Sequence, residues 1–465
     1  MLFLQFVLYL AHAAAILPYP FDIDQGEGYD LNAGWLLARG RSIYTDNESF
    51  PYFSSNYPPV YSLAVAAATG IWGPVLLAGR TVSLVATLGL AALIFLAARE
   101  RSNGLGGLVA AGAFWMSDYV YHVTPLARVN ALTGFLALGG LLCAGRAGWV
   151  WIAAGAAMLL AALYTKPTAV DAVAAALLWL WLEDRRVCLV VGAGLAGATL
   201  LIGATLEVFT ARAFSLNVLV GNLNPFVPGQ LEQYFANFAL LHAVPLGLAA
   251  YSVARSIRGR RIDGVQLFFL AGLAAALGVG KWGAGESYFL SAIVASCILA
   301  GQVAGRLFER GGPAAALLPA LFLAQNIVSA HGAVSTRLPG LPDRGLQSAA
   351  LAPEPGYADL ERGHSIVTRL RAQPGPGLSE DPAFELAAGK EVVGNTTHLR
   401  NLYQAGLWRS DNLVADVAAR RYHTVVLDAE LYPEPVLAAI GRHYFLYDTV
   451  VVHRARQQIF LPGGS

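Results

Sequence analysis

The sequence predicts a mainly α-helical, polytopic membrane protein with a small α/β domain at its C-terminal end. Three observations predict this class. The chain of 465 residues is 56% hydrophobic and only 13% charged, whereas a soluble domain usually has about 25% charged residues. Long apolar runs recur up to about residue 332. The segment after them is mixed in polarity and contains short β-branched runs typical of strands.

Eleven apolar runs are candidate transmembrane helices, although several are shorter than the roughly 20 residues that a full span needs. The first run lacks a basic n-region and a small-residue cleavage site, so we interpret it as a retained helix and not as a signal peptide. The eleven runs are residues 2–17, 82–98, 104–120, 129–145, 148–164, 167–182, 187–208, 239–254, 265–280, 287–305 and 313–331.

Arginines in the short loops set the predicted orientation, because cytoplasmic loops collect Lys and Arg. Five basic loops occupy every second gap between the runs, and they contain Arg99, Arg146, Arg186, Arg258 and Arg306. All five lie on one side only if residues 59–77 do not cross the membrane. That segment is then a membrane-surface helix within a long outer loop, residues 18–81. The sequence therefore predicts eleven spans, a cytoplasmic N terminus and an extracytoplasmic C terminus.

Many ionisable side chains gather at the outer ends of the predicted spans. Charged groups inside a membrane cost about 2.5–3.5 kcal/mol each on insertion scales, so they tend to line cavities. The alternative for each is an anchor that snorkels to the interface. The acidic stretch at the start of the outer loop, Asp22, Asp24, Glu27 and Asp30, faces the same side. The other members of the group are Arg80, Asp118, His122, Arg128, Lys166, Glu207, Arg212, Lys281 and Glu286.

The predicted domains are a membrane module, residues 1–332, and an extracytoplasmic α/β domain, residues 333–465. A Pro/Gly-rich linker with the segments "TRLPGLPDRG" and "APEPGYADL" opens the second domain. The pattern of residues 375–393 predicts strand, turn, helix and strand. Further strands are predicted at 423–429, 447–453 and 457–462, with a helix at 434–444.

Several function classes are disfavoured by composition and motifs. The net charge of +1 argues against a nucleic-acid partner, which would require a basic surface. Cys143, Cys188 and Cys297 lie inside apolar runs, and their spacing indicates neither a disulfide framework nor a metal site. The sequence contains no phosphate-binding loop, dinucleotide fingerprint, HExxH or GxSxG motif. We predict no cofactor and no metal site, and dependence on a divalent metal stays open.

Short segments along the whole chain carry a family resemblance. Their order is "GEGY", "LLARGRSIY", "NYPPVYSL", "LLAGRTVSLVATL", "PLARVNAL", "LYTKPTAV", "NLNPF", "GAGESYFL" and "GPGLSEDPAFELAAGKEVV". This order resembles the GT-C superfamily of polyprenyl-phosphate-dependent glycosyltransferases. The branch it is most similar to holds bacterial proteins like the protein O-mannosyltransferases and the lipid A aminoarabinose transferase.

The resemblance implies a catalytic acid at the start of the first outer loop, where a general base would assist a hydroxyl acceptor. By position this acid is Glu27. Asp24 is the alternative, because many relatives read Asp-Glu-Gly where this chain has Gly26-Glu27-Gly28. Arg80 matches an arginine just before the family's second span, and an arginine fork suits a phosphate oxyanion. Lys166 and Arg128 are further candidate ligands of the lipid phosphate, with an interfacial anchor as the alternative role.

Further donor or acceptor contacts are predicted for six residues: Tyr57, Asp118, His122, Asn130, Lys281 and Glu286. Tyr57 precedes two prolines and is expected to shape a rigid turn. Asn130 departs from the family pattern, since relatives often carry Asp there. Asp118 or Glu286 would then supply the missing acid.

These expectations combine into one leading hypothesis. The protein moves a sugar from a polyprenyl-phosphate donor to a glycan, lipid or protein acceptor, with inversion, on the extracytoplasmic side of a bacterial inner membrane. A transporter or lipid flippase is one alternative, although such proteins usually show internal repeats and the sequence shows none clearly. A catalytically inactive envelope scaffold is the other, and the Asn130 departure keeps it open.

Overall fold

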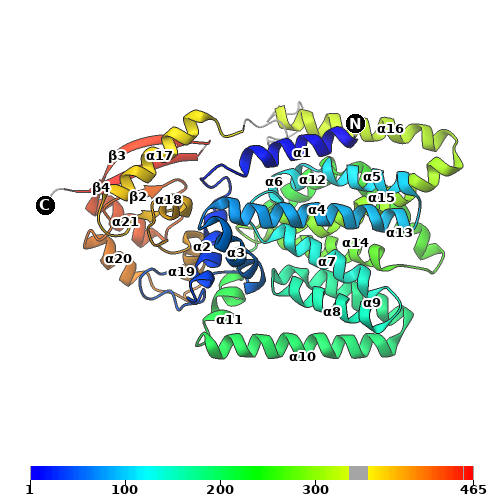
Figure 1. Ribbon diagram of the computed structural model, residues 1–465, viewed down its shortest axis with the longest axis horizontal. Coiled ribbons are helices and arrows are strands. Elements are labelled where there is room, and N and C mark those ends of the chain that lie inside the picture. Colours follow the sequence, from blue (N-terminus) through cyan, green and yellow to red (C-terminus); the bar gives the residue numbers. More distant parts are fainter. Residues whose placement is uncertain (1, 335–353, 454, 464–465) are drawn as a thin grey trace.

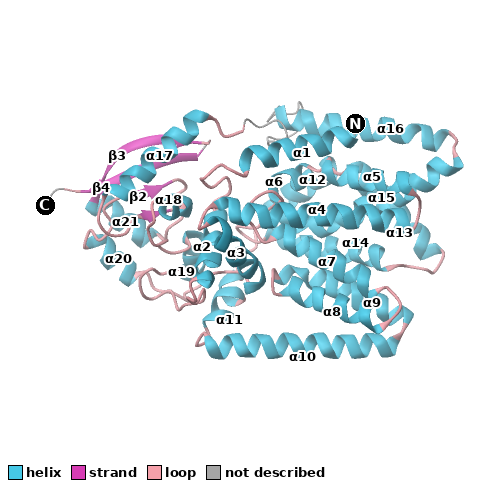
Figure 2. Cartoon of the chain, in the orientation of Figure 1, coloured by secondary structure: helices cyan, strands magenta, loops and turns pink. Residues whose placement is uncertain are grey.

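The protein consists of a long helical bundle with a small sheet-containing unit at one end (Figures 1 and 2). The structure, a computed structural model, describes residues 2–334, 354–453 and 455–463. Most of the predicted linker lies outside the described residues. The boundary between the two predicted domains therefore stays a prediction, although the bundle and the C-terminal unit are both present.

Each of the eleven apolar runs contains one main helix of the bundle, and some runs also include part of a shorter helix or a 3₁₀ turn. These helices are α1 (Leu2–Ile16), α4 (Leu76–Glu100), α5 (Gly104–Trp115), α7 (Asn130–Ala144), α8 (Trp149–Leu163), α9 (Val170–Glu183), α10 (Arg185–Phe209), α13 (Ala243–Arg258), α14 (Gly264–Ala276), α15 (Leu290–Arg310) and α16 (Pro313–Val334). Large apolar side chains stand exposed on several of them, for example Phe3, Val85, Leu200 and Phe209. Such surfaces are those of a membrane protein, because lipid can cover them without cost.

The number of complete spans stays a prediction. Among the residues that the structure describes, three helical segments are long and apolar enough to cross a membrane: Leu76–Glu100, Arg185–Phe209 and Glu286–Arg310. A fourth is possible if Pro228–Leu241 and Ala243–Arg258, which meet at 88°, form one broken span. Apart from α16, which has 22 residues, the other bundle helices have 12 to 16 residues. A helix rises 1.5 Å per residue, so 15 residues cover only about 22 Å of a hydrocarbon core of about 30 Å.

The outer loop is more helical than the sequence predicts. Helix α2 (Glu27–Ala38) packs beside α3 (Pro59–Trp72), which confirms a separate helix in the segment 59–77. Pro59 at its first position suits the fixed φ of proline, and Gly73 ends it with a φ of 77°. Helix α4 begins at Leu76, six residues before the predicted run, so Arg80 lies in a helix. The location of α3 on a membrane surface stays a prediction.

Short helices complete the end of the bundle that faces the C-terminal unit, which is called the outer end below. They are α6 (Asp118–Val123), α11 (Ala213–Val218), α12 (Pro228–Leu241) and the 3₁₀ turns η1 (Pro167–Ala169), η2 (Val220–Asn222), η3 (Leu277–Gly280) and η4 (Glu286–Phe289). The turns η1 and η4 directly precede α9 and α15. The polar residues before these helices are thereby placed at the outer end of the bundle.

The C-terminal unit packs helices on a four-stranded sheet. Its elements are α17 (Tyr357–Ala372), β1 (Leu378–Ser379), α18 (Pro382–Ala387), α19 (Thr396–Gln404), α20 (Asp411–Ala418), β2 (Val425–Leu427), α21 (Glu434–His443), β3 (Tyr444–Val452) and β4 (Ala455–Pro462). The strand order is β1-β2-β4-β3, with β1 parallel to β2 and the other pairs antiparallel. The predicted strands β2, β3 and β4 and the helix α21 are confirmed.

One predicted strand of this unit is wrong. Residues 391–393 form no strand, because the backbone there bonds to other partners. The Val393 N–H donates to Oε1 of Glu385, and the next N–H, of Gly394, donates to the carbonyl of Pro51 in the outer loop. Both Val392 and Val393 are buried, so the apolar pattern reflects core packing.

The outer loop lies between the bundle and the C-terminal unit, and it contacts both (Figure 1). A Cβ added at Gly28 of α2 would lie 2.6 Å from Cγ of Pro382, so only glycine permits this approach. Trp408 Nε1 donates to the carbonyl of Asn47 at 2.6 Å, and the Tyr52 hydroxyl donates to Asp416 at 2.7 Å. The C-terminal unit thereby covers the outer end of the bundle.

Candidate functional site

A cavity of about 840 Å³ opens between the outer end of the bundle and the C-terminal unit. Its walls come from the start of the outer loop, the segments before α7, η1 and η4, the end of α11 and the segment 395–401. Of the eleven predicted site residues, eight line this one cavity: Asp24, Tyr57, His122, Arg128, Asn130, Lys166, Lys281 and Glu286. Segments more than 200 residues apart in the sequence thus meet at one polar site.

Arg128 lies between two carboxylates. Its Nη1 is 3.8 Å from Asp24 Oδ1 and 3.6 Å from Asp30 Oδ2, and the guanidinium lies 5.9 Å from the ring of Tyr57. Burial alone would lower the pKa of Arg128, but the two acids outweigh it and raise the pKa, so the group stays charged. It is the fixed cation at the centre of the site.

The two acids differ in exposure and in pKa. The side chain of Asp24 is 43% exposed and that of Asp30 is 7% exposed. Burial opposes ionisation of Asp24, but Arg128 and the N–H of Gly26, 2.8 Å from Oδ1, hold its pKa below the ordinary value. Burial raises the pKa of Asp30 to about 7 despite Arg128. At neutral pH Asp24 is ionised and accessible, whereas Asp30 is half-titrated and enclosed.

Gly26 makes room for Arg128. A Cβ at this position would lie 1.2 Å from Nη1 of Arg128, so any side chain here would displace the guanidinium. The family resemblance implies an Asp at or beside this position. In this chain the space is taken by the arginine, and the carboxylates stand on either side of it in the sequence, at Asp24 and Asp30.

Lys166 is a second cation of the cavity. Its Nζ donates to Asn130 Oδ1 at 2.9 Å and to Ser287 Oγ at 3.1 Å, and it lies 5.0 Å from the ring of Tyr288. Burial lowers the pKa of Lys166 to about 7, and Arg128 adds to this effect. Because Asn130 is neutral, it orients the ammonium without cancelling its charge, whereas an Asp here would form an ion pair with it.

Lys281 is the third cation that lines the cavity. Its Nζ donates to the carbonyl of Asn222 at 3.0 Å and lies 5.9 Å from the ring of Tyr288, so this ring is close to both lysines. Glu286 lies 3.7 Å from His122. Burial opposes ionisation of Glu286, but the contacts with His122 hold its pKa below the ordinary value.

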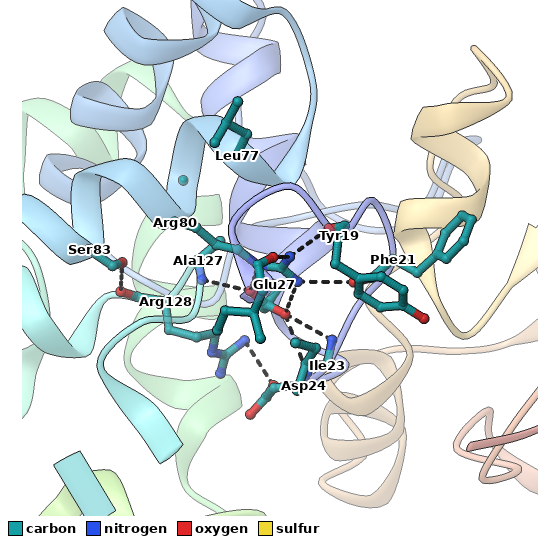
Figure 3. A network of polar contacts seen from close by, with 12 residues as sticks. Tyr19, Phe21, Ile23, Asp24, Glu27, Leu77, Arg80, Ser83, Ala127 and Arg128 are labelled. Carbon is teal, nitrogen blue, oxygen red and sulfur yellow. Dashed lines mark hydrogen bonds and ion pairs between the residues drawn. The ribbon is translucent and has the colours of Figure 1, made fainter. Parts of the chain in front are cut away.

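Glu27 and Arg80 do not line this cavity, and they pair with each other (Figure 3). Both side chains are fully buried. Nε and Nη2 of Arg80 each donate to one oxygen of Glu27 at 2.8 Å. The remaining guanidinium N–H groups donate to main-chain carbonyls of Ile16, Tyr19 and Phe21. All five donors of Arg80 are thereby satisfied, which a buried arginine requires.

Both carboxylate oxygens of Glu27 also accept further hydrogen bonds. Its Oε1 also accepts from the N–H of Ala127 at 2.8 Å, and its Oε2 accepts from the N–H of Ile23 at 2.9 Å (Figure 3). These contacts give no support to Glu27 as the base or to Arg80 as the ligand of the lipid phosphate, and both roles stay predictions. Neither side chain reaches solvent or has a free position for a ligand. Sequence reasoning missed this because spacing alone does not show which face of α2 an acid occupies.

Three other predicted polar residues lie away from the cavity. Asp118 begins α6 and is buried without lining the cavity. Glu207 accepts from the hydroxyl and the N–H of Ser215, so it anchors the turn after α10. Arg212 lies in that turn with a φ of 71°. Glu207 and Arg212 also lie outside the cavity lining.

Other residues that line the cavity carry weaker sequence signals. Asp30 belongs to the acidic stretch, but no feature of the sequence distinguishes it from the other acids there. Asn395, Thr397 and Asn401 belong to the C-terminal unit, and only the tertiary fold brings them to the cavity. Throughout residues 2–334, 354–453 and 455–463, no group of three or more His, Cys, Asp or Glu side chains is arranged to hold a metal ion.

Comparison with solved structures identifies the fold. ArnT from Cupriavidus metallidurans in the apo state matches with a TM-score of 0.64 and 14% identity, over 99% of both chains. The same protein bound to undecaprenyl phosphate matches with a TM-score of 0.61 and 13% identity, over 99% of this chain and 98% of that one. The chain has the GT-C fold. No protein-family profile and no curated protein matches the sequence.

A second GT-C protein shares the architecture more distantly. The archaeal oligosaccharyltransferase AglB from Archaeoglobus fulgidus, in complex with an inhibitory peptide and a dolichol-phosphate, has a TM-score of 0.56 and 11% identity. The match covers 96% of this chain and 73% of that one. The resemblance drawn from the short sequence segments is thereby confirmed at the level of the fold, over essentially the whole chain.

The buried pair makes a testable stability prediction. Glu27→Gln leaves a charged arginine enclosed without its counter-ion, so we expect a loss of about 3–5 kcal/mol of stability. Arg41→Gln is the control. It removes an exposed ion pair with Glu391, 2.8 Å apart and about 40% exposed on both sides, for which about 0–1 kcal/mol is expected. Thermal unfolding of both variants in detergent measures the difference. Equal melting temperatures would contradict the structural role of Glu27.

Proposed function

We propose that the protein is a glycosyltransferase that moves a sugar from a polyprenyl-phosphate donor to a hydroxyl acceptor in the outer cavity. The observation that carries this proposal is the arrangement of Arg128, Lys166 and Lys281 around a cavity that also presents the ionised Asp24. The lysines and the arginine suit a phosphate, and the carboxylate suits an acceptor proton. The GT-C fold supports the same reading, since ArnT with this fold binds undecaprenyl phosphate.

The donor phosphate would bind against Arg128 and Lys166. The guanidinium offers a planar fork for two phosphate oxygens, and the ammonium adds a point charge. Phosphate binding would draw Arg128 away from Asp24, which frees the carboxylate for the acceptor. Tyr288, close to both lysines, would offer an apolar face to the sugar or to the first isoprene units.

The reaction would be a single displacement. The acceptor oxygen forms a bond to the anomeric carbon while the bond from that carbon to the phosphate oxygen breaks. The acceptor proton passes to Asp24, and the electron pair of the broken bond remains on the phosphate oxygen. Arg128 and Lys166 stabilise this developing charge in a partly enclosed site. Attack from the face opposite the phosphate inverts the anomeric configuration.

Asp24 is assigned as the base because it is ionised and reachable, and Asp30 as a positioning residue for Arg128. The proposal names no particular sugar, and its acceptor is a glycan, a lipid or a protein. The extracytoplasmic location of the cavity and of the C-terminal unit in a bacterial inner membrane remains part of the proposal. It rests on the basic loops at the other end of the bundle.

The base assignment is tested by Asp24→Asn, which keeps size and most hydrogen bonding but cannot accept a proton. We expect transfer from a labelled polyprenyl-phosphate sugar to fall by about 10²–10⁴-fold, with normal insertion and melting temperature. Asp46→Asn, an exposed acid of the same loop, is the matched control and should keep full activity. Full activity of the Asp24 variant would remove the proposed base. Sustained solute or lipid flux by that variant would instead favour a transporter.

Lys166 makes donor binding dependent on pH. Because its pKa is lowered to about 7, Lys166 is charged below that pH and neutral above it. The donor is a phosphodiester and does not titrate there, so the donor KM should rise by up to about tenfold per pH unit between pH 7.5 and 9. Lys166→Arg keeps the charge and should flatten most of this slope. Asp30 ionises in the same window and accounts for any slope that remains. An identical slope in both proteins would refute the role of Lys166.

A further inference from the structure

A second large cavity lies at the opposite end of the bundle. Its volume is about 1010 Å³, and its walls come from the C-terminal ends of α9, α13 and α15, the residue after α4, and the loop before α14. Helix α15 follows Ser287 and Tyr288 of the outer cavity and ends at Arg310 in this second one. Its 21 residues measure about 31 Å at 1.5 Å each, close to the thickness of a hydrocarbon core.

Positive charge dominates the lining. Six arginines face two acids, Glu183 and Asp263. Asp263 is already paired, since its Oδ2 lies 2.6 Å from Nη1 of Arg101. Within the described part of the chain, no ion pair engages the other five arginines, which are Arg255, Arg260, Arg261, Arg306 and Arg310. So many like charges around one cavity repel each other, and an anion bound between them would relieve the repulsion.

The loop that supplies two of these arginines has an unusual backbone. Arg260 has a φ of 52°, a left-handed conformation that glycine usually occupies. The turn is closed by the Arg260 N–H to the Ile257 carbonyl and the Arg261 N–H to the Ser256 carbonyl. A glycine at this position would end α13 with less strain. The chain instead keeps an arginine here, and its side chain lines the cavity.

One wall of the cavity is apolar and closely packed. Trp179 lies between two glycines: a Cβ at Gly145 would be 1.8 Å from its ring, and a Cβ at Gly264 would be 2.1 Å from it. Leu182, Tyr251, Val303 and Leu307 line the cavity with it. A site that combines arginines with such a wall suits an amphipathic anion, whose charged head meets the arginines and whose chain lies against the apolar surface.

We propose that this cavity binds a phosphate-bearing anion with at least two negative charges, supplied by an anionic membrane lipid. Basic pockets between helices at a membrane surface bind such headgroups. The site lies at the far end of the bundle from the catalytic cavity and does not depend on the proposed transfer reaction. The shared chemistry also fits a soluble polyphosphate, and the experiment distinguishes the two sources.

The experiment measures binding to the full-length protein in a neutral detergent. Cardiolipin, which carries two phosphates, is titrated against phosphatidylcholine and against soluble pyrophosphate. Melting temperature and native mass spectrometry are the readouts. We expect saturable stabilisation and retention by cardiolipin and none by phosphatidylcholine. Arg255→Gln/Arg310→Gln removes two exposed arginines of the cavity and should weaken cardiolipin binding about 30-fold.

Two further variants separate the site from general surface charge. Arg255→Lys/Arg310→Lys preserves the charge that sets membrane topology and should restore only part of the affinity, because lysine lacks the planar fork. Arg185→Gln/Arg186→Gln removes two exposed arginines at the start of α10, outside the cavity, and should bind like wild type. Equal losses in both glutamine variants, or equal binding of both lipids, would overturn the site. Tight pyrophosphate binding that depends on Arg255 and Arg310, without lipid selectivity, would support the phosphate site and assign it to a soluble ligand.

Discussion

The buried ion pair between Glu27 and Arg80 is the constraint on which the outer end of the protein depends. Arg80 holds the end of α1 through the carbonyl of Ile16 and the following turn through Tyr19 and Phe21. Glu27 ties α2 to α4 and also accepts from the N–H of Ala127. Because Ala127 directly precedes Arg128, the same pair fixes the main chain that carries the central cation of the cavity. A charge pair enclosed in this way is costly to break, so it makes one arrangement of the outer loop strongly preferred.

The acids of the outer loop therefore have two different structural roles. Glu27 begins α2 and faces inward, and Asp24 and Asp30 flank Arg128 on the cavity side. Three lining groups then acquire properties that an ordinary surface would not give them: a charged Arg128, a Lys166 with a pKa near 7 and an ionised Asp24. The neutral side chain of Asn130 is consistent with these charge states. It holds Lys166 at 2.9 Å and leaves its charge for a ligand.

The sequence predicted the architecture better than the roles within it. Apolar runs located the eleven main helices of the bundle, and β-branched runs located β2, β3 and β4, because both signals are local. Eight of eleven candidate residues lie at one cavity, since their positions at span ends already reflect one side of the bundle. The pairing of Glu27 with Arg80 was not predicted, because two oppositely charged residues 53 positions apart give no local sign that they pair. The contribution of Asn395, Thr397 and Asn401 was missed for the same reason: it arises from the docking of the C-terminal unit.

In the proposed mechanism the lipid phosphate binds at Arg128 and Lys166, and the Glu27–Arg80 pair stays intact. An experimental structure of the protein with undecaprenyl phosphate tests it most directly. We predict phosphate density within hydrogen-bonding distance of Arg128 and Lys166, an Asp24 carboxylate turned toward the open cavity, and unchanged contacts between Glu27 and Arg80. Phosphate density on Arg80, with Glu27 displaced from it, would contradict the account.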